Sequence, residues 1–214
     1  FTFLQFILVI VSFLGLIISF VNSDFSNETV FNHSHSTKPI FYKISGTWGN
    51  HEGSLLLWLV VLTLFIFLFL IGSKGLLKNY RILTVLFHQI IIIGFFIFLI
   101  KSSSPFNFIL PAPSEGLGLN PILQDPALAI HPPILYLGYV GSSIIFSSVL
   151  AATTLNYISK NWAAHIKSWV LISWVFLTLG ILLGSIWAYY ELGWGGFWFW
   201  DPVENVSLMP WLAL

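Results

Sequence analysis

Long apolar runs separated by polar segments dominate this chain from end to end. Five of these runs approach the roughly 20 residues that a helix needs to cross the hydrocarbon core of a bilayer. They lie at residues 2–21, 53–71, 83–100, 134–154 and 168–189. A sixth run covers residues 206–214 and would be only the start of another span. The pattern predicts an all-α integral membrane protein, a single polytopic domain over residues 1–214 with five complete spans.

The composition agrees with a membrane location and narrows the chemistry. Of the 214 residues, 57% are hydrophobic and only 7% are charged, with a mean hydropathy of +0.90. A soluble domain carries about a quarter charged residues. The net charge is zero, so the charge balance does not indicate a nucleic-acid partner. The sequence contains no cysteine, so any thiol chemistry must come from another molecule.

The basic residues predict the orientation of the spans. Two short loops, at residues 72–82 and 155–167, hold five of the eight Lys and Arg residues, so the positive-inside rule places these loops on the cytoplasmic or matrix side. The opposite, outer face would then carry three longer loops, which contain all eight acidic residues. These outer loops lie at residues 22–52, 101–133 and 190–205. We therefore expect the polar chemistry on the outer face.

His131 is the strongest single candidate for a metal ligand. Asp125 followed by Pro126 is typical of a helix N-cap and first helical residue. A short helix from there would carry His131 to the membrane surface, where Pro132 and Pro133 would open the next span. A neutral imidazole is a good axial ligand for haem iron, and a stiff backbone would fix its approach. The alternative is a histidine that caps a helix or bonds a loop carbonyl.

A dense aromatic segment occupies the third outer loop. Trp194, Trp198 and Trp200 lie close to Gly195 and Gly196. Indole rings offer large apolar faces, and glycines let the backbone approach a ligand closely. The segment therefore suits a flat, conjugated ligand such as a porphyrin. The alternative is an interfacial belt, because tryptophan is enriched wherever proteins cross a bilayer surface.

The aromatic segment ends in a predicted helix start. Asp201, Pro202 and Glu204 have the spacing of an N-cap, a first helical residue and the third residue of a capping box. This favours a role for both acids in holding the loop. The other hypothesis is that one of them orients the polar edge of a ligand.

Two residues at the start of the second span are secondary candidates. His51 is a possible further outer ligand, while Glu52 could cap the helix or bond another loop. A structural role is favoured for both, because lone polar side chains at helix starts usually form hydrogen bonds with the backbone of the helix.

Four blocks of sequence resemble one family in order along the chain. They are Trp48–Trp58, Asn120–Gly141, Leu179–Gly184 continuing through Pro210 and Trp211, and Trp194–Asn205. The last block resembles the tryptophan-rich "WWD" signature of haem-handling proteins. Together the blocks are similar to the N-terminal portion of the CcmF-type haem lyase subunit of the system I cytochrome c maturation pathway. Phe197 departs from the signature, since it stands where the family usually has tryptophan.

The resemblance implies a site and a substrate. It implies haem b held at the outer face by the tryptophan segment, with His131 as an iron ligand. That haem would come from a haem chaperone and pass to the reduced Cys-X-X-Cys-His motif of apocytochrome c. In the family pattern a second outer histidine and the haem-b histidines lie beyond the equivalent of Leu214. The chain alone would then be an incomplete part of the lyase.

The resemblance also implies partners and a location. The partners would be other maturation subunits, the remaining part of the CcmF-like protein and membrane lipid. Split versions of this subunit are typical of mitochondrial genomes, so we expect the mitochondrial inner membrane with the site facing the intermembrane space. The alternative is a bacterial inner membrane with the site facing the periplasm.

Two other functions stay open at this point. A non-catalytic haem carrier of the CcmC kind would share the tryptophan signature. A cytochrome-b-like electron carrier would need paired histidines inside two spans, and His88 is the only histidine within a predicted span. A transporter is disfavoured, because its binding site would place polar residues and broken helices at mid-membrane.

Overall fold

The computed structural model describes residues 1–193 and 196–214, a part of the chain that is helical and contains no β-strand. In chain order the segments are α1 (Thr2–Asn22), α2 (Glu28–His33), α3 (Ile40–Gly46), α4 (His51–Gly72), α5 (Lys78–Ser102), the 3-10 turn η1 (Pro121–Leu123), α6 (Pro126–Tyr139), α7 (Ser142–Thr154), α8 (Lys160–Glu191) and α9 (Pro202–Ala213). Within these described ranges, five spans are long and apolar enough to cross a membrane: α1, α4, α5, α6 with α7, and α8. The predicted all-α multi-pass fold is confirmed.

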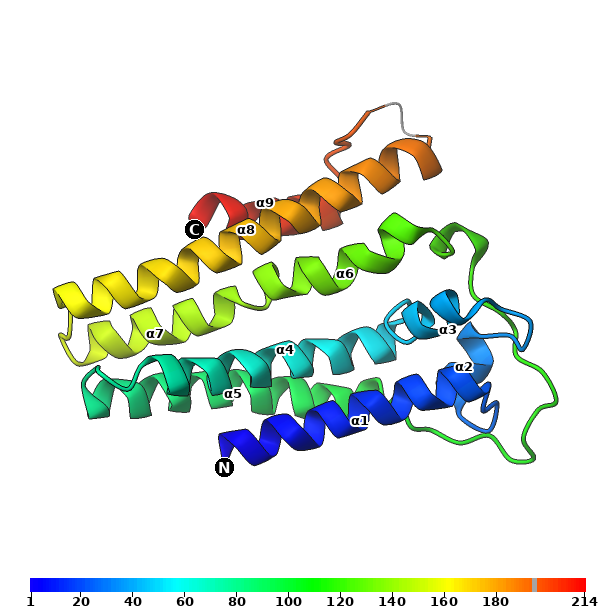
Figure 1. Cartoon of the computed structure of the whole chain (residues 1–214), viewed down its shortest axis with the longest axis horizontal. Coiled ribbons are helices and arrows are strands. Elements are labelled where there is room, and N and C mark those ends of the chain that lie inside the picture. Colours follow the sequence, from blue (N-terminus) through cyan, green and yellow to red (C-terminus); the bar gives the residue numbers. More distant parts are fainter. Residues whose placement is uncertain (194–195) are drawn as a thin grey trace.

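The long helices run side by side and place the loops at two ends (Figure 1). The α4–α5 and α7–α8 turns, which hold most of the basic residues, lie together at one end. The other end carries α2, α3 and the segments that lead into α6 and α9. We call this second end the outer end, following the orientation that the basic loops predict.

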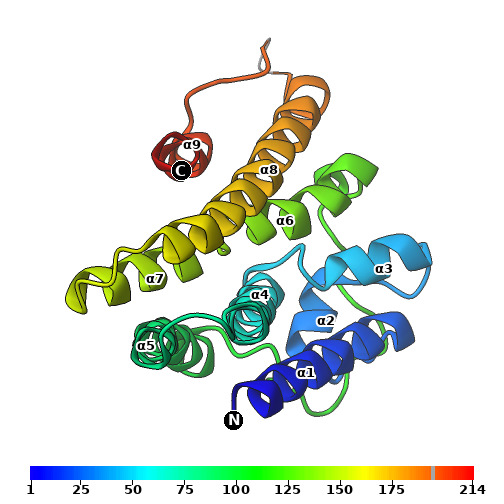
Figure 2. The ribbon, with the colours of Figure 1, turned by 60° about the vertical axis from the view of Figure 1, so that its left-hand side comes forward.

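Helix α4 lies in the middle of the bundle, between α1, α5 and the α6–α7 pair (Figure 2). Its buried residues include Leu59, Leu62 and Ile66. His88 of α5 is fully buried against it, with Nε2 3.0 Å from the Leu62 carbonyl oxygen. Polar side chains inside a membrane commonly join helices in this way. His88 therefore connects α5 to α4, and this contact occupies one of its ring nitrogens.

The helix that carries His131 differs from the sequence prediction. Instead of a short surface helix followed by a span that opens at Pro132, α6 runs without interruption from Pro126 to Tyr139, and the expected 134–154 span breaks between α6 and α7. Pro133 has no N–H to donate to the carbonyl of Ala129, four residues before it. Trp48 Nε1 donates to that carbonyl oxygen instead, at 2.9 Å. This contact satisfies an acceptor that the proline leaves free.

Helices α6 and α8 approach each other closely because glycines line their contact. A Cβ atom added to Gly180 would lie 2.5 Å from the Cα of Leu135, and one added to Gly138 would clash with the backbone of Leu177. Small residues at such positions let two membrane helices approach backbone to backbone. This glycine-lined contact, the α6–α8 seam, fixes the spacing of the two helices that frame the candidate site.

The two long outer segments are tied together by backbone and side-chain hydrogen bonds. Glu28 N donates to Asn107 O at 2.9 Å, and Ile109 N donates to Ser26 O at 2.8 Å. Farther along, the Glu115 carboxylate accepts hydrogen bonds from the hydroxyl and the backbone N–H of Ser36. These bonds hold α2 and the segment before α6 as one outer layer.

Glu115 makes part of this outer layer sensitive to acid. The hydrogen bonds from Ser36 lower the pKa of Glu115 from its ordinary value of 4.5 to about 2. A lowered folded-state pKa stabilises the fold above the unfolded value and loses that contribution as pH falls from about 4.5 towards 2. We expect Glu115→Gln to speed amide hydrogen exchange at Ser36 and Gly116 at neutral pH. The matched control is Glu191→Gln at the end of α8. Unchanged exchange at Ser36 would contradict this role.

Candidate functional site

His131 lies where α6 faces α8 near the outer end of the bundle. Its Nδ1 is 2.7 Å from the carbonyl oxygen of Gly180. A carbonyl can only accept a hydrogen bond, so Nδ1 carries a proton, and in the neutral imidazole Nε2 keeps its lone pair. Within the described residues Nε2 has no hydrogen-bond partner. The imidazole is thus oriented by one nitrogen and free to act as a ligand through the other.

Further contacts position this imidazole and the helix that carries it. Gly184 of α8 faces it so closely that an added Cβ would lie 2.6 Å from the His131 Cε1. Asp125 caps α6 as predicted, because its carboxylate accepts from Leu128 N at 2.9 Å. The same oxygen accepts from the Tyr190 hydroxyl at 2.6 Å, which ties the end of α8 to the start of α6.

His131 lines a pocket of about 100 Å³ between α6, α8 and α9. Trp187 and Trp198 also line it, and their indole N–H groups are buried with no hydrogen-bond partner in the described chain. Buried donors without partners cost free energy and are uncommon in native proteins. The residues that line the pocket therefore include one imidazole nitrogen without a partner and two tryptophans whose N–H groups have none.

A second pocket, of about 360 Å³, adjoins the first between α8 and α9. The two pockets share Ile181, Ser185 and Trp198, while Phe197 and Trp211 line only the second. Pockets for small ligands usually measure about 300–1,000 Å³, and they are mostly apolar with few polar groups. The first pocket alone is too small for a porphyrin. The pair offers a large apolar surface beside the imidazole.

The tryptophan segment is only partly placed around these pockets. Trp194 and Gly195 lie outside the described residues. Trp198 contacts Trp200 edge to face, with ring centroids 5.9 Å apart, and Trp200 is 68% exposed. A Cβ added to Gly196 would lie 3.9 Å from the Trp198 carbonyl oxygen, an ordinary van der Waals distance. Among the described tryptophans and glycines of this segment, Trp198 is therefore the one that lines the pockets.

The two acids after the tryptophan segment form the predicted capping box. Asp201 accepts from Glu204 N at 2.6 Å, and the Glu204 carboxylate accepts from the backbone N–H of Phe199 at 2.8 Å. Both acids also line the 100 Å³ pocket. Their capping role is confirmed. A contact between either acid and a ligand stays a prediction.

The secondary candidates lie apart from His131. His51 is bonded through Nδ1 to the Ser103 hydroxyl at 3.0 Å and lines a separate apolar pocket of about 420 Å³. Glu52 lines a different, polar pocket. Of the two roles considered for Glu52, capping α4 falls instead to Asn50, which accepts the hydrogen bond from Gly53 N at 2.7 Å. An Asn directly before the helix reaches the free N–H groups better than a residue already in its first turn.

Several residues of the site were missed at the level of sequence. Trp187, Tyr190 and the glycines that face α6 were not singled out as ligand-positioning residues. The spacing of Gly180 and Gly184 is the available signal, because small residues four apart on a membrane helix indicate a close helix contact. In contrast, no local pattern marks Tyr190, since its partner Asp125 is 65 residues away.

The comparisons with known proteins identify the family of the chain. The profile of the family described as "Cytochrome C assembly protein" matches residues 48–214. The "Cytochrome c-type biogenesis protein CycK" of Bradyrhizobium diazoefficiens is 53% identical over 209 residues, and the "Cytochrome c-type biogenesis protein CcmF" of Escherichia coli is 45% identical over 216 residues. These alignments cover 98% and 100% of this chain, but 32% and 33% of the two relatives.

A solved structure shares the fold. The protein titled "Cytochrome c Heme Lyase CcmF" superposes with a TM-score of 0.82 at 34% identity, over 99% of this chain and 33% of that one. The chain thus spans about a third of the length of the relatives it matches. The family profile covers most of the chain, and the arrangement of its helices agrees with a solved member. The chain belongs to the cytochrome c assembly protein family.

Proposed function

We propose that this chain is the haem-holding part of a CcmF-type cytochrome c haem lyase, and that haem is its substrate. The observation that carries the proposal is the hydrogen bond from His131 Nδ1 to Gly180 O at 2.7 Å. It orients the imidazole and leaves the Nε2 lone pair for iron, the arrangement found in most histidine metal ligands.

The residues around His131 fit haem in shape and polarity. Trp198 and the 360 Å³ apolar pocket would take one face of the porphyrin, because a flat conjugated ring stacks favourably on indole. The unpartnered indole N–H groups of Trp187 and Trp198 would donate to the anionic edge of the ligand. No cluster of three or more His, Asp or Glu residues within the described ranges could hold a free metal ion.

The work of this chain would be positioning. Haem supplies the vinyl groups, and the substrate apocytochrome c supplies the thiols, since this chain has no cysteine. Holding the two reactants in register lowers the barrier without an acid–base pair. We also assign haem binding to the WWD segment, which includes Trp194 and Gly195. The partners in this function would be the haem chaperone, the other maturation subunits and the remaining part of the lyase.

The location belongs to the same proposal. The relatives reported above are bacterial, and they fit an inner membrane with the site facing the periplasm. A mitochondrial inner membrane with the site facing the intermembrane space is the equivalent arrangement in an organelle. Cysteine accessibility scanning from either side of the membrane would test the orientation.

The test of the function uses the intact complex that contains this chain. We expect Trp198→Ala to lower the retained haem, measured as pyridine haemochrome per complex, by about tenfold or more, because a large apolar contact is lost. Covalent haem–cytochrome product should fall in parallel. The matched control is Trp162→Ala, a half-buried tryptophan at the opposite end of α8.

Two outcomes would contradict the proposal. Haem content equal to that of the wild type would remove Trp198 from the site. Retained haem with no covalent product, in a complex whose partners are complete, would instead indicate a haem carrier of the CcmC kind.

A further inference from the structure

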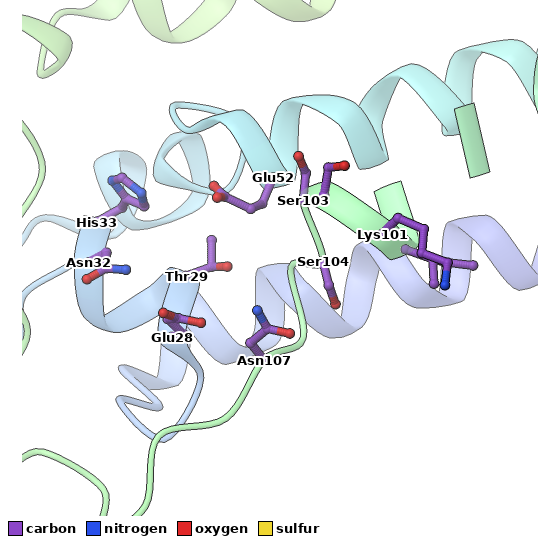
Figure 3. A pocket seen from close by; sticks show the side chains of 11 residues that line it. Glu28, Thr29, Asn32, His33, Glu52, Lys101, Ser103, Ser104 and Asn107 are labelled. Atoms are coloured by element: carbon purple, nitrogen blue, oxygen red, sulfur yellow. The ribbon is translucent and has the colours of Figure 1, made fainter. Parts of the chain in front are cut away.

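A polar pocket of about 290 Å³ lies at the outer ends of α4 and α5, apart from the pockets beside His131 (Figure 3). Helix α2 contributes Glu28 and Thr29, α4 contributes Glu52 and the last turn of α5 contributes Lys101. The proposed haem site uses none of these residues.

The charged groups of this pocket have no partner among the described protein residues. The carboxylates of Glu28 and Glu52 and the ammonium of Lys101 make no hydrogen bond and no ion pair in the part of the chain that the structure describes. Thr29 is only 4% exposed, yet its hydroxyl also lacks a partner there. Figure 3 shows the Thr29 side chain directed into the space below Glu52. The hydroxyl oxygen itself is not fully enclosed, so it is open to water or to a ligand in the pocket.

These groups have an order along the direction of the spans. In Figure 3 Lys101 lies on the side where α4 continues into its span, whereas Glu28 and His33 lie on the opposite side. Next to Lys101, Ile100 and Ile97 are 69% and 58% exposed on the outer surface of α5, where lipid chains would contact the helix. From the bilayer outwards the order is therefore the apolar surface, then the cation, then the group formed by the Thr29 hydroxyl and the two carboxylates.

That order is complementary to one class of ligand. A phospholipid with a primary ammonium presents acyl chains, then an anionic phosphate, then a cation with three N–H donors. A metal ion fits less well, because no group of three or more His, Asp or Glu side chains among the described residues could hold one. A simple amine would be repelled by the positive charge of Lys101, and the Lys101 ammonium would then have no anionic partner.

We propose that this pocket binds the headgroup of a phosphatidylethanolamine-type lipid of the outer leaflet. Lys101 pairs with the phosphate, while Glu28, Glu52 and Thr29 accept the ammonium N–H groups. A choline headgroup has no N–H donor and would leave these acceptors unmatched.

The neighbouring histidine is compatible with a cationic headgroup. Burial lowers the pKa of His33, and the charge of Glu52 only counteracts this in part. His33 is therefore neutral near pH 7 and does not repel an ammonium group. The bound lipid would join α2 to the ends of α4 and α5, so it would order the outer layer independently of haem.

The experiment counts lipids on the intact complex that contains this chain. The complex is extracted from nanodiscs with equal fractions of phosphatidylethanolamine, phosphatidylcholine and phosphatidylglycerol, and bound lipids are identified by native mass spectrometry. We expect one retained phosphatidylethanolamine. The double substitution Glu28→Gln with Glu52→Gln should lower its retention by about tenfold or more, because charge-assisted hydrogen bonds are lost. Lys101→Gln should also lower its retention.

The controls remove one like charge elsewhere on the surface. Glu191→Gln and Lys167→Gln, both at exposed positions on α8, should retain the lipid as the wild type does. The haem content of every variant verifies that the complex is intact. The proposal would be overturned if phosphatidylcholine were retained as well as phosphatidylethanolamine. It would also be overturned if the Glu28→Gln, Glu52→Gln double variant retained phosphatidylethanolamine at the wild-type level. In a separate experiment, the soluble headgroup glycerophosphoethanolamine is added at the same concentration as the lipid. If it displaced the lipid, the pocket would be a site for a free zwitterion.

Discussion

His131→Ala is expected to remove the haem signal of the outer site from the intact complex. The substitution deletes the nitrogen that we propose as an iron ligand, and partners that merely orient such ligands already change metal affinity by about 10- to 100-fold. Loss of the ligand itself should therefore weaken haem retention by roughly 100-fold or more. The reduced and oxidised spectra of the purified complex, with its other subunits present, would measure this loss.

A matched control and a rescue separate ligation from folding. His35→Ala removes an outer-face histidine whose ring bonds Thr37 and lies away from the pockets, so the spectra should not change. Imidazole added to the His131→Ala complex should restore part of the signal, because the small ring can enter the space that the side chain leaves. Spectra of His131→Ala that match the wild type would rule out the ligand role.

The features that the sequence predicted are those with local causes. Each long apolar run is sufficient to require a helix in a bilayer, because hydrocarbon cannot satisfy free backbone groups. The caps at Asp125 and Asp201 were also predictable, since an N-cap acts on N–H groups two or three residues away. The tryptophan signature and His131 were singled out for the same reason, as unusual residues in short windows.

The features that the sequence did not predict depend on contacts between distant segments. Pro132 and Pro133 suggested the opening of a new helix, yet α6 continues through them. Part of the reason is Trp48, which donates to Ala129 O from 81 residues away. The bonds of His131 to Gly180 O and of Tyr190 to Asp125 likewise join α6 to α8. Such partners are known only once the helices are packed.

Gly184→Ala is expected to change the environment of a bound haem without removing its ligand. An added Cβ would lie 2.6 Å from the His131 Cε1, so the imidazole would have to move away from Gly180 O. The hydrogen bond that sets the tautomer would then lengthen or break. We expect a shifted haem spectrum and a roughly 10- to 100-fold weaker retention, the usual cost of a lost partner to a metal ligand.

The control for this substitution is Gly94→Ala, because Gly94 of α5 has no neighbouring atom within 4 Å of the added Cβ. There the alanine should stabilise the helix slightly and leave the haem spectrum unchanged. If Gly94→Ala shifted the spectrum as much as Gly184→Ala, the effect would belong to helix propensity. It would then say nothing about the contact with His131.

A double-mutant cycle shows whether Gly184 acts through His131. If its only effect is to position the imidazole, Gly184→Ala should lower haem retention in the wild type and have almost no effect once His131 is alanine, since interacting residues are not additive. A loss that persists in the His131→Ala background would mean that the new methyl group widens the α6–α8 seam as a whole. Gly180 and Leu135 form the same seam one turn away, so that result would assign Gly184 to helix packing. The orientation of His131 would then depend on its hydrogen bond to the Gly180 carbonyl alone.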